Sequence, residues 1–127
     1  MQPQKIVYHK RSKTLELGFP GESLSLPAEL LRVYSPSAEV RGHGNEARKL
    51  QTGKKHIGIT AIEPVGNYAI RITFDDGHDS GLYAWDYLRD LGENLDRYWR
   101  EYLDEMKAAN ASRLPVIPLG HWTPPKG

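Results

Sequence analysis

The amino-acid sequence predicts a small single domain of the α+β class, with helices packed on one face of an antiparallel sheet. Three observations lead to this class: the length of 127 residues, the alternation of apolar and polar residues in two separate stretches, and a change to helical spacing after residue 85. Because hairpin turns join the alternating segments, the sheet should be antiparallel. We expect one domain over residues 1–127, with an extended C-terminal arm over about residues 110–127.

An N-terminal hairpin comes first. Apolar residues alternate with polar ones over residues 6–9 and 15–19, and the polar run Arg11-Ser12-Lys13 between them suits a tight turn. Residues 22–26 continue in an extended conformation. The pattern therefore predicts two antiparallel strands followed by a further extended segment.

A short helix and a long loop should follow the hairpin. Pro27 is a favoured first residue of a helix and Pro36 cannot continue one, so we expect a helix between them. Residues 35–55 contain few apolar side chains and several glycines, which is typical of an exposed loop, with one helical turn near residues 46–50. Long loops in compact domains are commonly functional.

The next segment predicts a three-stranded meander. Apolar residues alternate over residues 57–61, again over 68–74, and a third time over 78–83. Gly66-Asn67 and Asp76-Gly77 supply the two hairpin turns. We therefore expect three consecutive antiparallel strands here.

Two helices and an apolar arm complete the chain. Residues 85–91 predict one or two helical turns, Gly92 should break the helix, and residues 93–109 carry apolar residues at helical spacing on one face. The run 114–119 contains two prolines, so it should form an extended arm rather than a helix or a central strand. The second helix should bury four side chains against the meander: Leu95, Trp99, Tyr102 and Met106.

Composition excludes several classes of chemistry. No cysteine is present, so the chain has no disulfide, no thiolate metal site and no cysteine nucleophile. No apolar run approaches the ~20 residues that a membrane span needs, and the first residues lack the pattern of a signal peptide. We therefore expect a cytoplasmic protein with no membrane partner.

None of the common catalytic motifs occurs in the sequence. The five histidines show no metal-binding spacing, and none has an acidic residue two positions further on, as the facial triad of non-haem iron enzymes commonly has. The P-loop, the nucleophile elbow and the dinucleotide glycine pattern are also missing. We therefore expect a protein that is not an enzyme.

Positive charge is concentrated in the long loop. Such a loop could meet phosphate groups, or it could be a solvated surface. Nucleic-acid surfaces usually add exposed aromatic side chains or a reading helix, and this loop has no aromatic residue, so we expect a protein partner rather than nucleic acid. The charged residues are Arg41, Arg48, Lys49, Lys54 and Lys55, with His43 and His56.

Two stretches concentrate the residues that could bind a ligand. The first runs from Ser35 to Gly44 and the second from Asp75 to Ser80. Their carboxylates and imidazoles could hold a divalent ion, or they could form a network of salt bridges. An arginine in the cluster favours the network, because its guanidinium would compete with a cation for the same oxygens. The candidate binding residues are Arg41, His43, Asp76, His78 and Asp79, supported by Glu39 and Asp75.

These stretches belong to a series of motifs that resembles a known family. The motifs, in order, are Leu31-Arg32, the run 35–44, Ala47-Arg48-Lys49-Leu50, Phe74-Asp75-Asp76-Gly77-His78 and Trp85-Asp86-Tyr87-Leu88. Over about residues 13–105 the chain is similar to the gamma-butyrobetaine-hydroxylase-like N-terminal domain family, whose small free-standing bacterial members have no assigned function. In other relatives the domain is fused to a dioxygenase or to an Mrp-type iron–sulfur scaffold ATPase.

In the hydroxylase branch the resemblance implies a zinc site with three cysteines and one histidine. The cysteine positions fall on Ser35, Ser37 and Val40 of this chain, while the histidine is kept as His78. Serine hydroxyls are poor zinc ligands at neutral pH and valine is none. We therefore expect no zinc at these positions, and any divalent metal would have to use the carboxylates and imidazoles instead.

The resemblance implies a non-catalytic accessory or binding module that contacts another protein. An alternative is a small metal-binding protein linked to iron or iron–sulfur handling, and a third is an enzyme that uses His43 and His78. If the two stretches meet in the fold, Arg41, His43 and His78 should lie close together. Nearby carboxylates should then favour the protonated form of His78.

Overall fold

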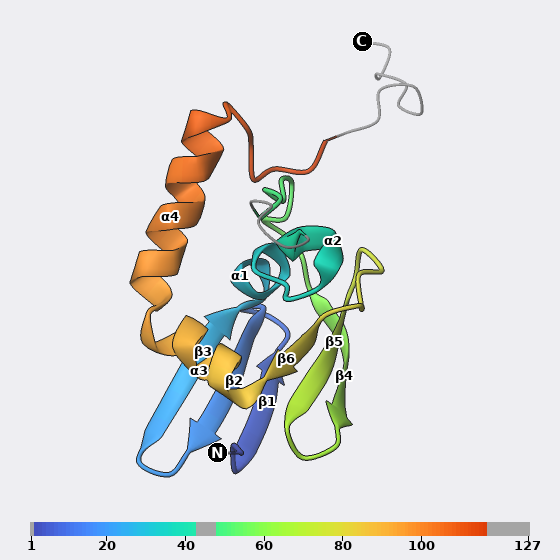
Figure 1. Ribbon diagram of the computed structural model, residues 1–127, viewed down its shortest axis with the longest axis vertical. Coiled ribbons are helices and arrows are strands. Elements are labelled where there is room, and N and C mark those ends of the chain that lie inside the picture. The colour runs from blue at the N-terminus through green and yellow to red at the C-terminus, as the bar shows by residue number, and fades with distance from the viewer. Residues whose placement is uncertain (1, 43–47, 117–127) are drawn as a thin grey trace.

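The computed structural model describes residues 2–42 and 48–116 and contains two three-stranded antiparallel sheets with helices (Figure 1). This arrangement confirms the predicted α+β class. The predicted antiparallel sheet is divided into two, and each sheet follows the chain order of its strands. The first sheet contains β1 (Lys5–His9), β2 (Thr14–Phe19) and β3 (Glu22–Pro27), and the second contains β4 (Ile59–Val65), β5 (Ala69–Phe74) and β6 (Leu82–Ala84).

The first sheet extends the predicted hairpin by one strand. Leu15 and Leu17 of β2 are fully buried, whereas Glu16 between them is only partly buried, as the alternation predicts. The segment that we expected only to be extended pairs with β2, and its register sets Leu24 opposite Leu17 and Leu26 opposite Leu15. The third strand therefore adds apolar side chains to the same face.

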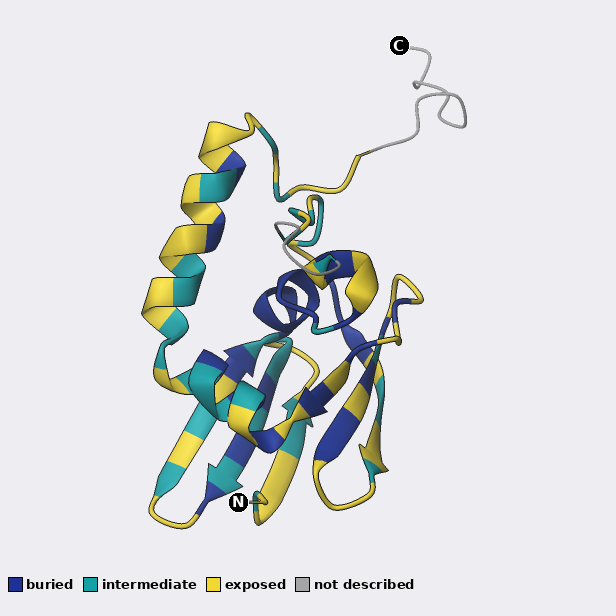
Figure 2. Ribbon diagram, in the orientation of Figure 1, coloured by how far each residue is buried: buried dark blue, intermediate teal, exposed yellow. Residues whose placement is uncertain are grey.

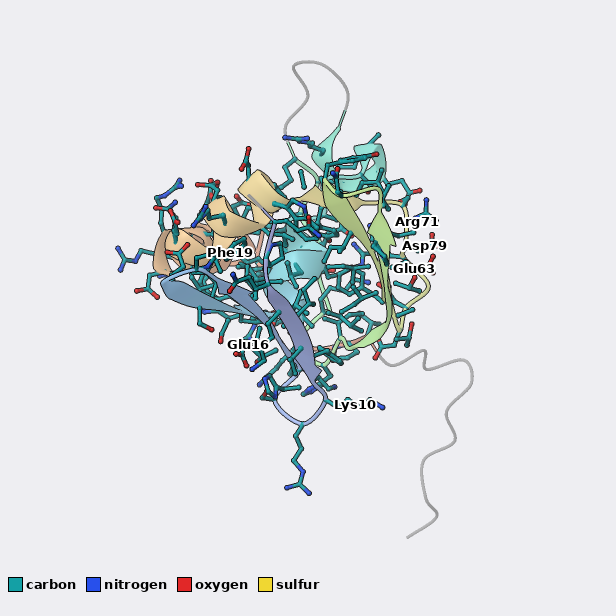
Figure 3. The ribbon with its side chains drawn as sticks, turned by 90° about the horizontal axis from the view of Figure 1, so that it is seen from below. Lys10, Glu16, Phe19, Glu63, Arg71 and Asp79 are labelled. Atoms are coloured by element: carbon teal, nitrogen blue, oxygen red, sulfur yellow. The ribbon has the colours of Figure 1, made fainter. Side chains whose placement is uncertain are left out.

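The second sheet is the predicted meander. Gly66 and Gly77 adopt positive φ angles of 54° and 89° in its two turns, where other residues would be strained. Strand β6 is shorter than expected, because residues 78–80 are not in strand conformation. Seen from below, the sheets face each other across side chains of the core, with Glu16 outside the first sheet and Glu63 and Arg71 outside the second (Figure 3).

Two short helices follow the first sheet. All six residues of α1 (Ala28–Val33) are buried, which makes it the centre of the molecule (Figure 2). The sequence did not predict α2 (Ala38–Arg41), a helix of a single turn. The helical turn expected near 46–50 is not seen at residues 48–50, and residues 43–47 lie outside the described part.

The expected helix break at Gly92 is wrong. Gly92 lies inside α3 (Trp85–Glu93), and the chain turns at Asn94 before α4 (Leu95–Ala108). A Cβ atom at position 92 would come within 2.9 Å of Leu24 Cδ1, so glycine allows α3 to pack closely on β3. A glycine that permits close packing looks the same in the sequence as one that breaks a helix.

Helix α4 does not pack against the meander as expected. Tyr102 and Met106 are buried, but Leu95 and Trp99 are only partly so. The Tyr102 hydroxyl donates to Glu29 of α1 over 2.7 Å, and α1 lies between α4 and the second sheet in Figure 1. Helical spacing predicts an apolar face, but it does not say which element covers that face.

The described part of the C-terminal arm is held by its backbone and by one arginine. The carbonyl oxygens of Ser112 and Arg113 accept hydrogen bonds from the N–H groups of Gly53 and Lys55, at 3.0 and 2.9 Å. Leu114 and Val116 are 53% and 89% exposed, so their apolar side chains do not dock. The rest of the predicted arm, residues 117–127, lies outside the described residues.

No helix in the described ranges is long and apolar enough to cross a membrane.

Candidate functional site

The two stretches that carry the candidate residues meet at His78. Its Nε2 atom lies 2.8 Å from Ser35 Oγ and 3.4 Å from Ser37 Oγ. Ser35 is 1% exposed and His78 is 9% exposed, so these contacts are buried. We call residues 35–41 and 75–79 the two-loop site.

Local geometry turns the His78 ring inward. Gly77 donates its N–H to Phe74 O over 3.0 Å, and the N–H of His78 donates to Asp76 Oδ1 over 3.1 Å, which closes a tight turn. Gly81 makes room for the partner loop, because a Cβ atom there would lie 2.6 Å from Ser35 Oγ. The histidine is therefore positioned by the sequence Asp-Gly-His and by a nearby glycine.

Asp76 is neutralised by cations of its own chain. Its Oδ2 atom accepts hydrogen bonds from Arg32 Nε over 2.9 Å and from Lys54 Nζ over 2.6 Å. Burial raises the pKa of Asp76, but the hydrogen bonds from Lys54, from the His78 N–H and from Arg32 outweigh burial and lower this pKa to about 2. Asp76 is therefore charged and already paired.

The expected protonation of His78 is wrong. Burial lowers the pKa of His78 from its ordinary value, and the positive charge of Arg32 lowers it further. The carboxylates of Glu39, Asp76 and Asp79 act in the opposite direction, but they do not overcome the first two effects. Burial of the ring and the approach of Arg32 both depend on the fold, so the sequence pattern alone misjudged the direction of the His78 pKa shift.

The remaining candidate residues are only partly brought together. Arg41 is exposed and its guanidinium lies 5.9 Å from the centre of the Tyr87 ring; within the described ranges it forms no ion pair. Asp75 accepts a hydrogen bond from the Gly58 N–H, and Asp79 is exposed. His43 lies outside the described residues. Within the described part, the site therefore consists of Asp76 and His78 with their partners.

The converging residues do not fit the zinc site that the family resemblance implies. Ser35, Ser37 and His78 do come together, and Val40 is buried nearby in the same loop. Two hydroxyls and an isopropyl group nevertheless replace three thiolates. Among the residues that the structure describes, no group of three histidine, cysteine or acidic side chains could hold a metal ion.

The same contacts resemble those of an activated serine. Ser35 touches His78 Nε2, and Glu39 Oε2 lies 3.5 Å from Nδ1 on the other side of the ring. However, Ser35 Oγ also accepts the Ser37 N–H over 3.3 Å and lies against the backbone at Gly81. A substrate carbonyl has no access to an atom packed in this way, so the arrangement joins two loops rather than presenting a nucleophile.

Part of the basic loop is also used within the fold. Arg48 donates two hydrogen bonds to Glu105, at 2.6 and 2.7 Å, and lies 4.1 Å from the centre of the Tyr34 ring. Lys54 pairs with Asp76. Two of the five cations are therefore engaged inside the molecule.

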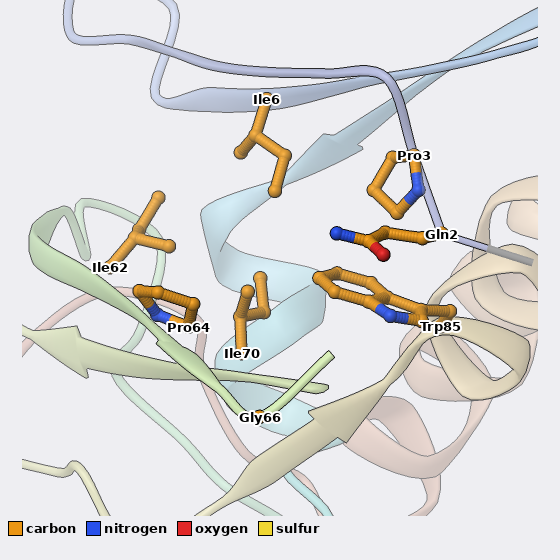
Figure 4. Close-up of a pocket in the computed structure, with 8 residues that line it drawn as sticks. All are labelled: Gln2, Pro3, Ile6, Ile62, Pro64, Gly66, Ile70 and Trp85. Carbon is orange, nitrogen blue, oxygen red and sulfur yellow. The ribbon is translucent and has the colours of Figure 1, made fainter. Parts of the chain in front are cut away.

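An open apolar cleft lies between the two sheets, and the sequence did not indicate it. Its volume is about 340 Å³, and Ile6 faces Ile62, Ile70 and Trp85 across the opening (Figure 4). The Trp85 Nε1 atom donates to Asn67 O over 2.8 Å, which fixes the indole ring. Trp85 belongs to the buried core at 8% exposure and forms the inner wall of the cleft. A proline inside β4, Pro64, is a sequence signal of an accessible strand edge here.

Two three-stranded antiparallel sheets, with helices and with two loops joined at His78, define the class of this protein: a small α+β domain. Residues 6–89 match the family model described as gamma-butyrobetaine hydroxylase-like, N-terminal. The chain belongs to this family, as its sequence motifs predicted.

Several solved structures are similar to this chain, including the following three. Two of them are solution NMR structures. The first is 49% identical, the match covers 97% of this chain and 98% of the other chain, and the TM-score is 0.79. The second is 50% identical, the match covers 91% of this chain and 87% of the other chain, and the TM-score is 0.78. The third is a crystal structure of a protein with unknown function of the DUF971 family from Acidithiobacillus ferrooxidans, at 35% identity, 72% and 92% coverage and a TM-score of 0.61. No curated protein matches this chain.

Proposed function

We propose that this domain is a non-catalytic module that binds another protein, and that the cleft between its sheets receives an apolar segment of that partner. The observation that carries the proposal is the cleft itself, which presents Ile6, Ile62, Ile70 and Trp85 around an open volume of about 340 Å³. Binding pockets are typically concave and mostly apolar, with volumes of roughly 300–1,000 Å³.

The state of the two-loop site supports this choice. Ser35 and His78 are buried and satisfy each other, and Asp76 is paired with Arg32 and Lys54. These groups have few free hydrogen-bonding positions to offer a substrate. The cleft, in contrast, has an accessible apolar rim at Ile6, which is 37% exposed, while Ile70 and Trp85 at its base are 1% and 8% exposed.

The position of the cleft favours an extended protein segment over a compact small molecule. It lies between β1 and β4, and in the described sheets each of these strands pairs on one side only. A partner segment that runs along either edge can place an apolar side chain in the cleft while its backbone meets free strand groups. The metal-binding alternative has no comparable support, because the candidate donors of the two-loop site are engaged with each other.

The test compares two aspartate substitutions at equally exposed apolar positions. Ile6 lines the cleft at 37% exposure, whereas Leu103 lies on α4 at 39% exposure. We expect proteins captured from an extract of the source cells by wild-type protein and by Leu103→Asp to be lost with Ile6→Asp, and a reconstituted complex to weaken at least tenfold. Equal binding by all three folded proteins would contradict the proposal.

A further inference from the structure

A buried carboxylate in α1 holds an arginine side chain from the C-terminal segment. The Glu29 side chain is 7% exposed, and its two oxygens accept hydrogen bonds from Arg113 Nε and Nη2 at 2.7 and 2.8 Å. Tyr102 donates a further hydrogen bond to Glu29 over 2.7 Å. The guanidinium also lies 5.0 Å from the centre of the Trp99 ring.

These contacts select arginine over other cations. Two parallel hydrogen bonds to a carboxylate require the planar fork of a guanidinium, and an aromatic face stabilises the same group. A lysine ammonium can make only part of this arrangement. Glu29, Trp99 and Tyr102 therefore have the chemistry of an arginine receptor, which we call the Glu29 site.

The segment that carries Arg113 contacts the domain as a bound peptide would. Asn110, with a φ angle of 51°, turns the chain after α4, and the carbonyls of Ser112 and Arg113 accept two backbone hydrogen bonds from residues 53–55. Leu114 and Val116 remain exposed. One anchoring side chain and a few backbone hydrogen bonds are the usual elements of recognition of an extended peptide.

The segment that carries Arg113 adds little to the buried apolar core. Over residues 2–42 and 48–116, the last buried residue of the apolar core is Met106, and beyond it only Ala111 packs partly against that core. The matched family region ends at residue 89, well before Arg113. The receptor is built from α1, α4 and the loop at residues 53–55, and its occupant is a separate piece of chain.

We propose that the Glu29 site is a binding site for an arginine side chain in an extended segment of another protein, and that Arg113 is its tethered competitor. An empty site would leave a buried carboxylate without a partner, which is strongly unfavourable. If an arginine of the partner protein replaces Arg113 directly, the Glu29 carboxylate is never left without a partner. The site lies apart from the cleft, so this inference stands or falls independently of the proposed function.

The test uses the full chain and a peptide with blocked ends and the sequence of residues 110–116, Asn-Ala-Ser-Arg-Leu-Pro-Val. In Arg113→Gln the guanidinium of the tethered competitor is gone, and a shorter, neutral amide takes its place. We expect calorimetry to show that this variant binds the peptide at least tenfold more tightly than wild-type protein. A peptide with lysine in place of arginine should bind the variant at least tenfold more weakly.

Two further variants locate the binding. Glu29→Gln combined with Arg113→Gln should lose the peptide, because the receptor carboxylate is absent. Arg89→Gln is the matched control: Arg89 is 30% exposed against 31% for Arg113 and also lies over an aromatic ring, but it pairs with the accessible Glu22. Its peptide affinity should equal that of the wild type.

A conservative variant covers the case in which Arg113→Gln does not fold. Arg113→Lys keeps a positive charge beside Glu29 and loses only the paired geometry, so it should remain folded and still bind the peptide more tightly than the wild type does. If neither folded variant gains affinity, or if a peptide with alanine in place of arginine binds as well, Arg113 is only a structural anchor and the proposal is wrong.

Discussion

The two-loop site and the cleft between the sheets differ in composition and in availability. The two-loop site gathers histidine, serine and acidic side chains, but Ser35 and His78 are buried against each other and Asp76 is paired with two cations. Among the residues that the structure describes, the cleft has no ionisable side chain in its lining, yet it is open, and Ile6, Ile62 and Trp85 line it. Residues with reactive side chains therefore do not by themselves mark the surface that is free to bind.

The largest expected effect tests whether the two-loop site would bind zinc if it had the three cysteine thiolates that it lacks. Purified wild-type protein should hold no stoichiometric zinc in elemental analysis, because hydroxyls stand where thiolates are needed. The triple variant Ser35→Cys/Ser37→Cys/Val40→Cys should bind about one zinc per chain with His78, since Ser35 and Ser37 already touch its Nε2 atom. Structural zinc binding is worth on the order of 10 kcal/mol, so the variant should unfold at markedly higher temperature with zinc than with a chelator.

The single variant Ser35→Cys serves as the control and should gain no stoichiometric zinc, because one thiolate and one imidazole do not complete a tetrahedral site. A triple variant that folds but takes up no zinc would show that the loops are not arranged to close around a metal.

The next effect concerns how tightly the two loops are packed. Gly81→Ala places a methyl group 2.6 Å from Ser35 Oγ and 3.1 Å from Pro36 Cδ, so the loops must separate. We expect a loss of about 1–3 kcal/mol in the free energy of unfolding, the usual range for overpacking. Urea unfolding measures this loss. Gly18→Ala is the control and should lose less stability, because its new methyl group meets the Lys5 side chain at the longer distance of 3.2 Å. An equal loss in both variants would mean that the contact between the two loops is no tighter than an ordinary surface contact.

The sequence predicted those parts of the molecule that depend on local pattern. Alternation placed Leu15 and Leu17 in the core and identified all three strands of the meander, because burial in a strand follows a period of two. It missed the helix boundary at Gly92 and the neighbour of α4, because these depend on contacts between distant segments.

The candidate site shows the same division. The meeting of Ser35 and Ser37 with His78 was anticipated through family resemblance, not through spacing. The direction of the His78 pKa shift was misjudged because burial, its largest cause, and the nearby charge of Arg32 both arise only in the fold. The cleft was missed because its existence depends on how the two sheets open relative to each other, which no residue pattern records.

A smaller effect is the pH dependence that His78 contributes. Its pKa in the folded state is lower than the ordinary 6.5 of the unfolded chain, chiefly because of burial. At higher pH both states are neutral, but below about pH 6.5 the unfolded state takes up a proton more readily, and the folded state loses stability.

Urea unfolding between pH 7.5 and 5.5 measures this loss. The variant His78→Gln, whose amide can still bond to Ser35, should lose less stability over the same range than wild-type protein. Parallel curves for the two proteins would mean that His78 titrates equally in both states. The two proteins differ only at position 78, so the difference between their curves reports on His78.

The last comparison separates the open cleft from the closed two-loop site by placing a threonine hydroxyl in each, and the expected difference in the free energy of unfolding is small. Replacing valine by threonine puts a hydroxyl where a methyl group was and keeps the shape of the side chain, and replacing isoleucine by threonine also removes its terminal methyl group. In Val40→Thr, at 1% exposure, the new hydroxyl is buried and should cost about 1–3 kcal/mol, as unpaired buried polar groups do. In Ile6→Thr, at 37% exposure, water can reach the hydroxyl, so the cost should be about 0.5 kcal/mol, as for other surface changes. Urea unfolding of the two variants measures the difference, and an equal cost at both positions would mean that the cleft is closed in solution and cannot receive a partner.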